Sequence, residues 1–449
     1  MQRETGSPSR LLAHVNIVFF SQVASYGLAF ALRAMLAQGL GEEGLGTYSL
    51  FYVSVLVAGG ILSLGVGWAN VYYLNKGPYQ PSTLFFSSAL VWALGVGLVV
   101  VGALTHYWLR GAGAFVGGKA YWLYVPAVPT VVAYLFLTSF LQGQRRFGAL
   151  AGVAVSQGLA AVTASAALWA IDELTVGRIL GAWIASFAMA DVVTLFLLAP
   201  HRWRWEGVVG ALLFALKDQI RYGVQSQLGN LAQFLNYRLD HYLVAAFVSK
   251  GAVGQYTVAV GLSESLWWIS SAVVVVLSPR LSGMKREEAG ELALAAGRNV
   301  LMVMGVAALG LAFLSPWAIR LLFGREFLNA HRPLIILLPG GVAAGVSMVL
   351  GSYLFSQGRA ILNTVSICIA LVATIILDLL LIPWLEVEGA ALSSTLAYVL
   401  GLMCNIVWYR VVSGRPGWHI LAVGRRDLRL YRDLWRAIWG RFLAQPQEE

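Results

Sequence analysis

The chain has 449 residues, of which 59% are hydrophobic and only 12% are charged. A soluble domain carries about 25% charged residues, so the composition excludes an ordinary soluble protein and favours one embedded in a membrane. The formal net charge of +10 is explained by a face next to anionic lipid, and it requires no nucleic acid as a partner.

Long apolar stretches follow one another along the whole chain. A helix that crosses a bilayer needs about 20 such residues, and each stretch is at least that long. The sequence therefore predicts an all-α polytopic membrane protein with about twelve transmembrane helices. The predicted spans are 11–38, 47–74, 83–106, 121–142, 148–170, 178–199, 221–248, 253–278, 299–323, 334–356, 361–384 and 388–410.

Lysine and arginine predict how these spans are oriented. Most of those outside the spans fall in connecting segments on the same side as the N-terminus. By the positive-inside rule, both termini are expected in the cytoplasm. The first span is too long for the apolar core of a signal peptide and lacks a clear cleavage pattern, so it is expected to be retained.

Two short motifs occur twice. GLGTYSL at 44–50 is similar to AVGQYTV at 252–258, and QGQRRF at 142–147 is similar to QGRAI at 357–361. The two pairs occur in the same order with nearly the same separation, which indicates an old duplication. Six spans per half is an even number, so the halves are expected to be parallel repeats related by a pseudo-two-fold axis along the membrane normal, with a substrate site between them.

The duplication predicts the domain organisation. An N-terminal six-helix lobe at 1–200 is followed by an amphipathic cytoplasmic linker at 201–220 and a second lobe at 221–412. The tail at 413–449 combines an apolar stripe with five neighbouring arginines. It is expected to lie on the cytoplasmic leaflet, or to dock a partner protein.

Polar side chains inside the spans mark candidate binding residues, because hydrocarbon penalises them. In the seventh span, five fall on one narrow helical face; in the first span, three form a shorter face. Both faces are expected to line a shared cleft, although hydrogen bonds to neighbouring helices are the alternative. Arg238 lies off the main stripe and could instead pair with a carboxylate or extend to the interface. The cleft candidates are Gln22, Tyr26, Arg33, Ser226, Asn230, Gln233, Tyr237, Arg238 and Asp240.

Three further acids lie within spans: Asp191, Glu264 and Asp378. Each can pair with an arginine, share a proton with a neighbour, or couple an ion to transport, and structural pairing is the default. The two cysteines, Cys368 and Cys404, have no metal-binding spacing. No metal or cofactor is expected.

The motifs exclude some functions. No GxSxG, HExxH or P-loop pattern occurs, and the longest outer loop, at about 107–120, carries no carboxylate. An enzyme is therefore not expected. A duplicated, polar-faced bundle fits a transporter better than a channel.

Four segments carry a resemblance to the Wzx-type polysaccharide flippases, members of the multidrug/oligosaccharidyl-lipid/polysaccharide exporter superfamily. GLGEEGLGTYSL at 39–50 resembles the signature "lGpegfGlY", and LLFGREFLNAHRPLIILLPG at 321–340 resembles "lyGeeFlpA…pLriLlpG". The segments 222–269 and 356–401 are similar to the corresponding parts of the family.

This resemblance implies a two-lobed, MATE-like bundle that flips a polyprenyl-diphosphate-linked oligosaccharide across the bacterial inner membrane for surface polysaccharide or O-antigen synthesis. Asp240 and Glu264 fall on family-typical positions, whereas Asp378 stands where asparagine is usual and Gln38 where arginine is common. Expected partners are the lipid-linked substrate, membrane lipids and a glycan polymerase or glycosyltransferase, with the chain itself a monomer. The alternatives are a drug/cation antiporter of the same superfamily, with an acid-lined cavity, and a scaffold that does not transport.

Overall fold

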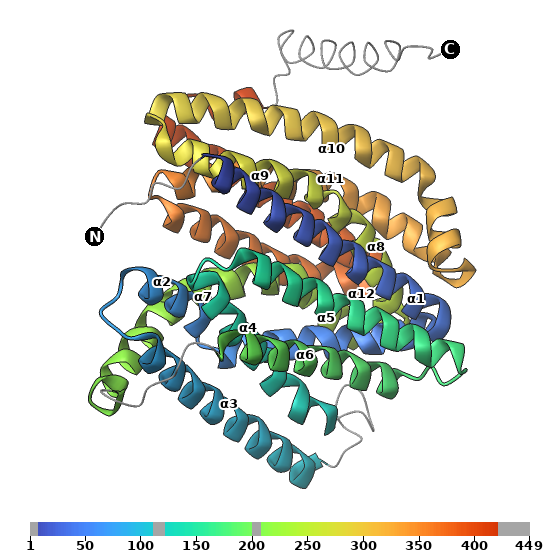
Figure 1. Ribbon diagram of the computed structural model, residues 1–449. Helices are drawn as coiled ribbons and strands as arrows, with labels where there is room; N and C mark the ends of the chain where they lie inside the picture. Colours follow the sequence, from blue (N-terminus) through green and yellow to red (C-terminus); the bar gives the residue numbers. More distant parts are fainter. Residues whose placement is uncertain (1–7, 111–121, 200–207, 421–449) are drawn as a thin grey trace, which may run out of the picture. The chain divides into compact units, whose positions relative to one another are not determined.

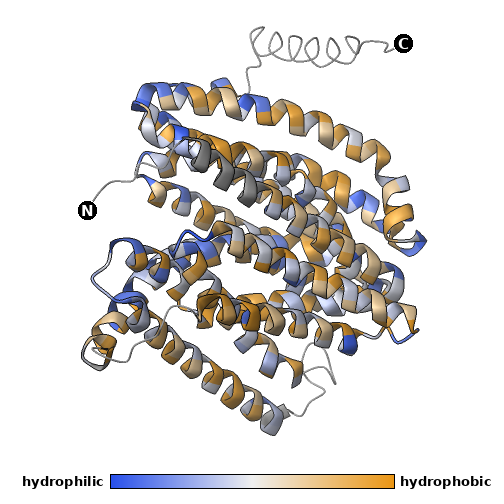
Figure 2. Cartoon of the chain, viewed as in Figure 1, coloured by the Kyte–Doolittle hydropathy of each residue, from blue (hydrophilic) through white to orange (hydrophobic). Residues whose placement is uncertain are grey.

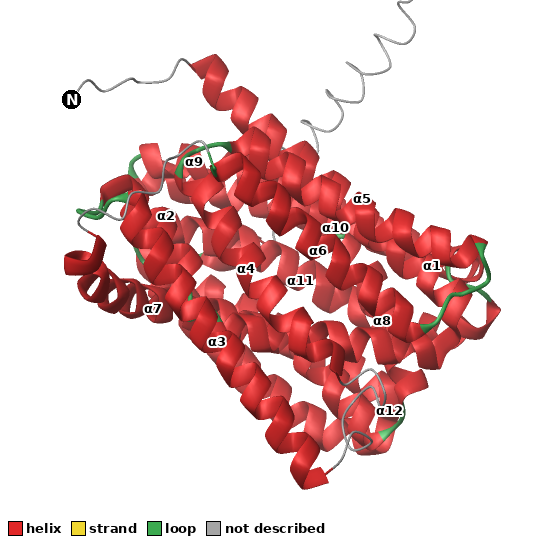
Figure 3. Ribbon diagram, turned by 60° about the horizontal axis from the view of Figure 1, so that its bottom comes forward, coloured by secondary structure: helices red, strands yellow, loops and turns green. Residues whose placement is uncertain are grey.

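The computed structural model describes residues 8–110, 122–199 and 208–420, and every regular element within these ranges is a helix (Figures 1 and 3). This confirms the predicted all-helical class. The helices are α1 (Pro8–Leu62), α2 (Val66–Lys76), α3 (Pro81–Arg110), α4 (Tyr124–Gly143), α5 (Phe147–Ala170), α6 (Val176–Leu198), α7 (Val208–Phe247), α8 (Lys250–Ser265), α9 (Trp267–Gly283), α10 (Arg286–Leu322), η3 (Arg325–Ala330), α11 (His331–Ser356), α12 (Ala360–Ser413) and η4 (Gly417–Ile420).

Nine helices in the described ranges are long and apolar enough to cross a membrane, with α8 and α9 counted as one and η3 and α11 counted as one. Their apolar residues are interrupted by hydrophilic ones mainly near helix ends and turns (Figure 2). Helix α7, which carries the predicted polar face, is not among the nine. A multi-pass membrane protein is therefore confirmed, whereas the number twelve stays a prediction. Most of the predicted tail, 421–449, lies outside the described residues.

Two very long helices each contain one bend. Helix α1 has 55 residues and bends at Gly41 (φ 69°, ψ −173°), between the first two predicted spans. Helix α12 has 54 residues and bends at Glu386 (φ 51°, ψ −125°), between the last two predicted spans. The sequence thus located both junctions, but each is a bend within a helix rather than a loop.

The predicted span 47–74 differs from the structure, because the chain turns at Leu64 and Gly65 before α2 begins. Both residues have positive φ, of 46° and 67°. A Cβ atom on Gly65 would lie 2.1 Å from the carbonyl oxygen of Gly223 in α7. The break therefore lets two backbones approach closely, which only glycine permits.

Helix α7 runs without a break from Val208 to Phe247, through most of the segment predicted as a linker at 201–220. Its first half is held to the loop between α2 and α3, where the Tyr79 hydroxyl donates a hydrogen bond of 2.6 Å to Asp218. Burial and this carboxylate raise the pKa of Tyr79 to about 12. The Tyr79 hydroxyl therefore stays protonated and remains a donor.

Buried amides and hydroxyls join α2, α3, α4 and α7. Asn70 Nδ2 donates to the hydroxyls of Ser88 and Ser139, each at 3.1 Å. Gln219 Nε2 donates to Asn70 Oδ1 at 2.7 Å, and Ser87 donates to Gln219. Because buried polar groups are costly unless they are paired, this network fixes the packing of the four helices.

The described chain forms two compact units, each built from segments far apart in sequence. In the second unit, Asn405 of α12 connects three side chains: its Nδ2 donates to Ser347 and Asn363, and its Oδ1 accepts from Ser366. The predicted lobes, 1–200 and 221–412, stay a prediction. The first unit comprises 1–262, 314–337 and 371–394, and the second 263–313, 338–370 and 395–449.

Within the first unit, the two copies of the duplicated motif contact each other. A Cβ atom on Gly46 would lie 1.8 Å from the carbonyl oxygen of Lys250, and one on Gly254 would lie 2.1 Å from that of Glu42. Thr257 Oγ1 donates to Ser49 Oγ at 3.0 Å, across a sequence separation of 208. Since Glu42 and Lys250 are separated by the same interval, these contacts are reciprocal, as they are at an interface with two-fold symmetry.

Candidate functional site

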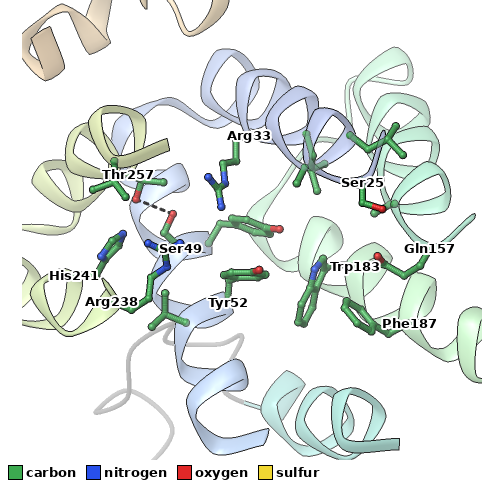
Figure 4. Close-up of a pocket in the computed structure, with 18 of the residues that line it drawn as sticks. Ser25, Arg33, Ser49, Tyr52, Gln157, Trp183, Phe187, Arg238, His241 and Thr257 are labelled. Atoms are coloured by element: carbon green, nitrogen blue, oxygen red, sulfur yellow. Dashed lines mark hydrogen bonds between the residues drawn. The ribbon is translucent and has the colours of Figure 1, made fainter. Parts of the chain in front are cut away.

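A cavity of about 140 Å³ lies within the first unit, enclosed by α1, α5, α6, α7 and α8 (Figure 4). Three basic side chains line it: Arg33 from α1, and Arg238 and His241 from α7. We call it the cationic cavity. Both sequence halves contribute to it, because α1, α5 and α6 precede the predicted linker and α7 and α8 extend beyond it.

No carboxylate is among the described residues that line the cationic cavity. Arg33 takes part in none of the ion pairs that the described residues form. Its guanidinium packs closely on α8, where a Cβ atom on Gly261 would lie 3.1 Å from Nη1. Arg238 Nη1 donates to the carbonyl oxygen of Tyr237 at 3.0 Å. The cavity is therefore suited to an anion.

Aromatic rings form another part of the wall (Figure 4). The rings of Tyr52 and Trp183 meet edge to face with centroids 5.7 Å apart, and those of Trp183 and Phe187 lie 4.9 Å apart. Beside them, Gln157 Nε2 donates to Ser186 Oγ at 2.9 Å. Such edge-to-face pairs favour fixed ring positions, so this wall is a preformed apolar surface beside the basic groups.

Asp240 is buried behind the cationic cavity and does not line it. One carboxylate oxygen contacts His241 Nδ1 at 2.8 Å, and the other accepts hydrogen bonds from the hydroxyls of Tyr256 and Ser394. This carboxylate therefore fixes the His241 ring, whose other edge is available to the cavity.

Asp378 in α12 is fully buried, and neither of its carboxylate oxygens receives a hydrogen bond from a described residue. Asp191 in α6 is also buried, and its Oδ1 receives none. Glu264 lies half-buried in α8. A buried charge without hydrogen bonds is costly, so Asp378 has the least favourable surroundings of the three acids.

The other predicted binding residues are spread over several places. Gln22 and Tyr26 line a side cavity between α1 and α5. Asn230 lines a larger cavity enclosed by α1, α2, α3, α4 and α7. Ser226, Gln233 and Tyr237 line neither this larger cavity nor the cationic one. The structure thus brings Arg33 and Arg238 together, without the rest of the polar face of α7.

The sequence did not single out Tyr48, Tyr52, Trp183 or Gln157, which also line the cationic cavity. Tyr48 and Tyr52 are four residues apart on one helical face, and this spacing is the sequence feature that could have identified them as neighbours in one wall. In an apolar span, however, aromatic residues at such spacing usually pack in the core. Among the described residues, no three His, Cys, Asp or Glu side chains cluster as metal ligands would.

Comparisons with known proteins agree with this architecture. Residues 11–285 match a family described as polysaccharide biosynthesis protein. A probable low-salt glycan biosynthesis flippase of Haloferax volcanii, Agl15, is 22% identical over 399 residues, which cover 86% of this chain and 81% of the relative.

Two solved structures are similar in fold. A lipid II flippase, MurJ, in an inward closed conformation has a TM-score of 0.72 and 13% identity, over 96% of this chain and all of its own. An inward-facing multidrug resistance transporter of the MATE family has a TM-score of 0.69 and 14% identity, over 87% of this chain and 94% of its own. At such low identity, these likenesses show the fold alone.

Proposed function

Because this chain belongs to the polysaccharide biosynthesis protein family, we propose that it is a flippase for a polyprenyl-diphosphate-linked oligosaccharide. The observation that carries the proposal is the cationic cavity, with Arg33, Arg238 and His241 on its walls and no carboxylate among the described lining residues. The glycan flippase from Haloferax volcanii supports the same substrate class.

The substrate explains why such a cavity is needed. A diphosphate and sugar hydroxyls cannot enter hydrocarbon without losing their hydrogen bonds to water. Arginine replaces those bonds with charge-assisted, often bidentate ones to phosphate oxygens. Arg33 and Arg238 hold the diphosphate, while the polyprenyl chain stays in the lipid. The two sequence halves alternate in exposing the cavity to either side of the membrane.

The chemistry of the cavity favours this function over a drug/cation antiporter, even though a multidrug transporter shares the fold. An organic cation requires negative or aromatic partners without competing basic groups. The cationic cavity offers two guanidinium groups and an imidazole. The two guanidinium groups repel a cation and attract the diphosphate.

Energy for uphill movement enters, in this proposal, through the buried acids. Neither carboxylate oxygen of Asp378 accepts a well-formed hydrogen bond from a described residue, so this acid gains most from binding a proton or a cation. Asp240 forms the link to the cavity, because its carboxylate contacts His241. The chain moves the lipid-linked oligosaccharide without making or breaking its covalent bonds.

The protein resides, we propose, in the bacterial inner membrane with both termini in the cytoplasm. A reporter that is active only in the cytoplasm, fused to the C-terminus, tests this orientation. The chain works as a monomer beside a glycan polymerase or glycosyltransferases that use the same lipid-linked intermediate.

The decisive experiment is flipping by the purified chain in liposomes. A fluorescent polyprenyl-diphosphate oligosaccharide is protected from a membrane-impermeant quencher once it reaches the inner leaflet. The variant Arg33→Ala with Arg238→Ala is expected to flip at least about tenfold more slowly, because each lost charge-assisted hydrogen bond is worth roughly 1.5–3 kcal/mol. The matched control is Arg178→Ala, which removes an exposed arginine paired with Glu173.

Three outcomes are informative. Slow flipping by the double variant, with normal flipping by the control, supports the assignment. Normal flipping by both shows that the two arginines do not hold the diphosphate. An absence of flipping by the wild-type chain, reconstituted and folded, favours the scaffold.

A further inference from the structure

The cavity lined by Asn230 adjoins the cationic cavity along two shared helices. It has a volume of about 430 Å³ and lies wholly within the first unit. On α1, Val53 lines the cationic cavity and Leu56 lines the larger one. On α7, Arg238 lines the cationic cavity and Phe234 lines the larger one. Residues three or four apart are neighbours on a helix surface. The two spaces are therefore about one helical turn apart.

The lining of this larger cavity is uncharged and mostly apolar, with amide and hydroxyl groups at several points. Among its described lining residues there is no Asp, Glu, Lys, Arg or His. The polar groups are amides and hydroxyls, and the apolar part of the wall consists of aliphatic side chains and aromatic rings, among them Trp68 and Trp92. We call it the neutral cavity. Amides and hydroxyls both donate and accept hydrogen bonds, so they match sugar hydroxyls, which do the same.

Some of these polar groups are committed to the fold. Ser88 and Ser139 belong to the network around Asn70. Gln227 Nε2 donates to the carbonyl oxygen of Gly60 at 3.1 Å, and Trp92 Nε1 donates to that of Pro129 at 2.8 Å. They hold the walls in place and make the cavity preformed.

Other groups remain available to a ligand. Gln142 of α4 is exposed, and its side-chain amide makes no hydrogen bond with a described residue. Asn230 donates from Nδ2 to the carbonyl oxygen of Ser226 and leaves Oδ1 free to accept. Trp68 of α2 is 48% exposed and presents an apolar ring. Three helices thus direct an amide, an amide oxygen and an indole to one space.

The volumes of the two cavities indicate which of them can hold a saccharide. Ligand sites for drug-sized molecules usually enclose about 300–1,000 Å³. The neutral cavity, at about 430 Å³, lies in this range, whereas the cationic cavity, at about 140 Å³, lies below it. The smaller space suits the phosphate groups, and the sugars attached to them require the larger one.

We propose that the neutral cavity binds the saccharide next to the diphosphate and selects glycans without charged substituents there. This inference rests on the proposed function. Burying a carboxylate or an ammonium in a space without an opposite charge is unfavourable. A uronic acid or a free amino sugar at this position is therefore rejected, whereas hexoses and N-acetylated sugars are accepted.

The test measures binding of three lipids to the full-length protein in detergent. The first is polyprenyl diphosphate, the second carries a neutral disaccharide, and the third carries the same disaccharide with a uronic acid next to the diphosphate. The wild-type chain is expected to bind the neutral glycolipid most tightly and the acidic one at least about tenfold more weakly.

Two variants and one control locate the effect. Trp68→Ala with Gln142→Leu is expected to bind the neutral glycolipid roughly tenfold more weakly, with sugar-free lipid unaffected, because it removes sugar contacts alone. Gln142→Lys is expected to bind the acidic glycolipid more tightly than the wild-type chain does. Trp384→Ala, at a tryptophan that is 86% exposed and lines neither cavity, is expected to change nothing.

Each contrary result has a distinct meaning. Unchanged preference for the neutral glycolipid in the Trp68 and Gln142 variant overturns the inference and leaves the proposed function intact. Equal weakening of all three lipids also overturns it, because the cavity then holds the lipid chain. Binding of none of the lipids by the wild-type chain overturns the proposed function, and the inference with it.

Discussion

Asp240 and Asp378 lie in the same unit, yet their surroundings differ sharply. Asp240 contacts a histidine ring and accepts bonds from two hydroxyls. Asp378 receives no hydrogen bond from any described residue. A group that the fold leaves without partners is either a cost to stability or a site that a mobile ion satisfies. Because stability and transport can be measured separately, a single substitution distinguishes the two.

Asp378→Asn is that substitution. The amide has nearly the same size and no charge, so the thermal midpoint of unfolding in detergent is expected to stay equal or rise. If Asp378 couples transport to an ion, the variant still flips substrate but no longer responds to an imposed proton or sodium gradient. Flipping that still accelerates with the gradient, in a stable variant, shows that Asp378 is not the coupling acid.

At the scale of single residues, the sequence identified the charged residues that line the cationic cavity but not the aromatic ones. Arg33 and Arg238 stand out in apolar spans, because hydrocarbon excludes a guanidinium unless it serves a purpose. Tyr52 and Trp183 suit an apolar span whether they face lipid, core or ligand. Only the packing of α1 against α5 and α6 shows that they line a cavity.

At the scale of helices, the two bends have different residues at their strained positions. Gly41 in α1 adopts φ 69° without a Cβ penalty, whereas Glu386 in α12 adopts φ 51° and carries that penalty. Strained positions of this kind cost roughly 1–3 kcal/mol. The Glu386 side chain is exposed, so little packing is lost when it is removed.

Glu386→Gly is therefore expected to stabilise the protein by about 1 kcal/mol, measured as a rise in the thermal midpoint of the purified chain. Glu386→Ala is the matched control, since it removes the carboxylate but keeps the Cβ atom and should give little gain. Equal effects of the two substitutions would show that charge, rather than backbone strain, limits stability at this bend.

Helices were predictable from sequence because apolar stretches of sufficient length have few alternatives in a membrane. The turn before α2 was not. ILSLGVGWAN at 61–70 is apolar except for Ser63 and Asn70, and no proline or charged residue marks Gly65 as a break. The position is explained by its approach to Gly223, a contact between residues far apart in the chain. A contact between residues so far apart in the chain produces no periodic pattern in the sequence.

At the scale of the whole molecule, the duplicated motifs provide a contact between the sequence halves. Ser49 of α1 and Thr257 of α8 both line the cationic cavity, and their hydroxyls are 3.0 Å apart. In the proposed cycle, the halves must separate around this cavity to expose it to each side. A covalent link here should therefore prevent one of the two states.

Ser49→Cys with Thr257→Cys tests this directly. The hydroxyl oxygens are 3.0 Å apart, so sulfur atoms at these two positions lie near each other, and a disulfide forms where the Cβ atoms can approach to about 3.5–4.5 Å. In a background where Cys368 and Cys404 are replaced by alanine, oxidation is expected to stop flipping and a reductant to restore it. Each single cysteine variant should flip normally under both conditions. Full transport by the cross-linked chain would place the moving interface elsewhere, because a contact that stays closed throughout the cycle must be a pivot.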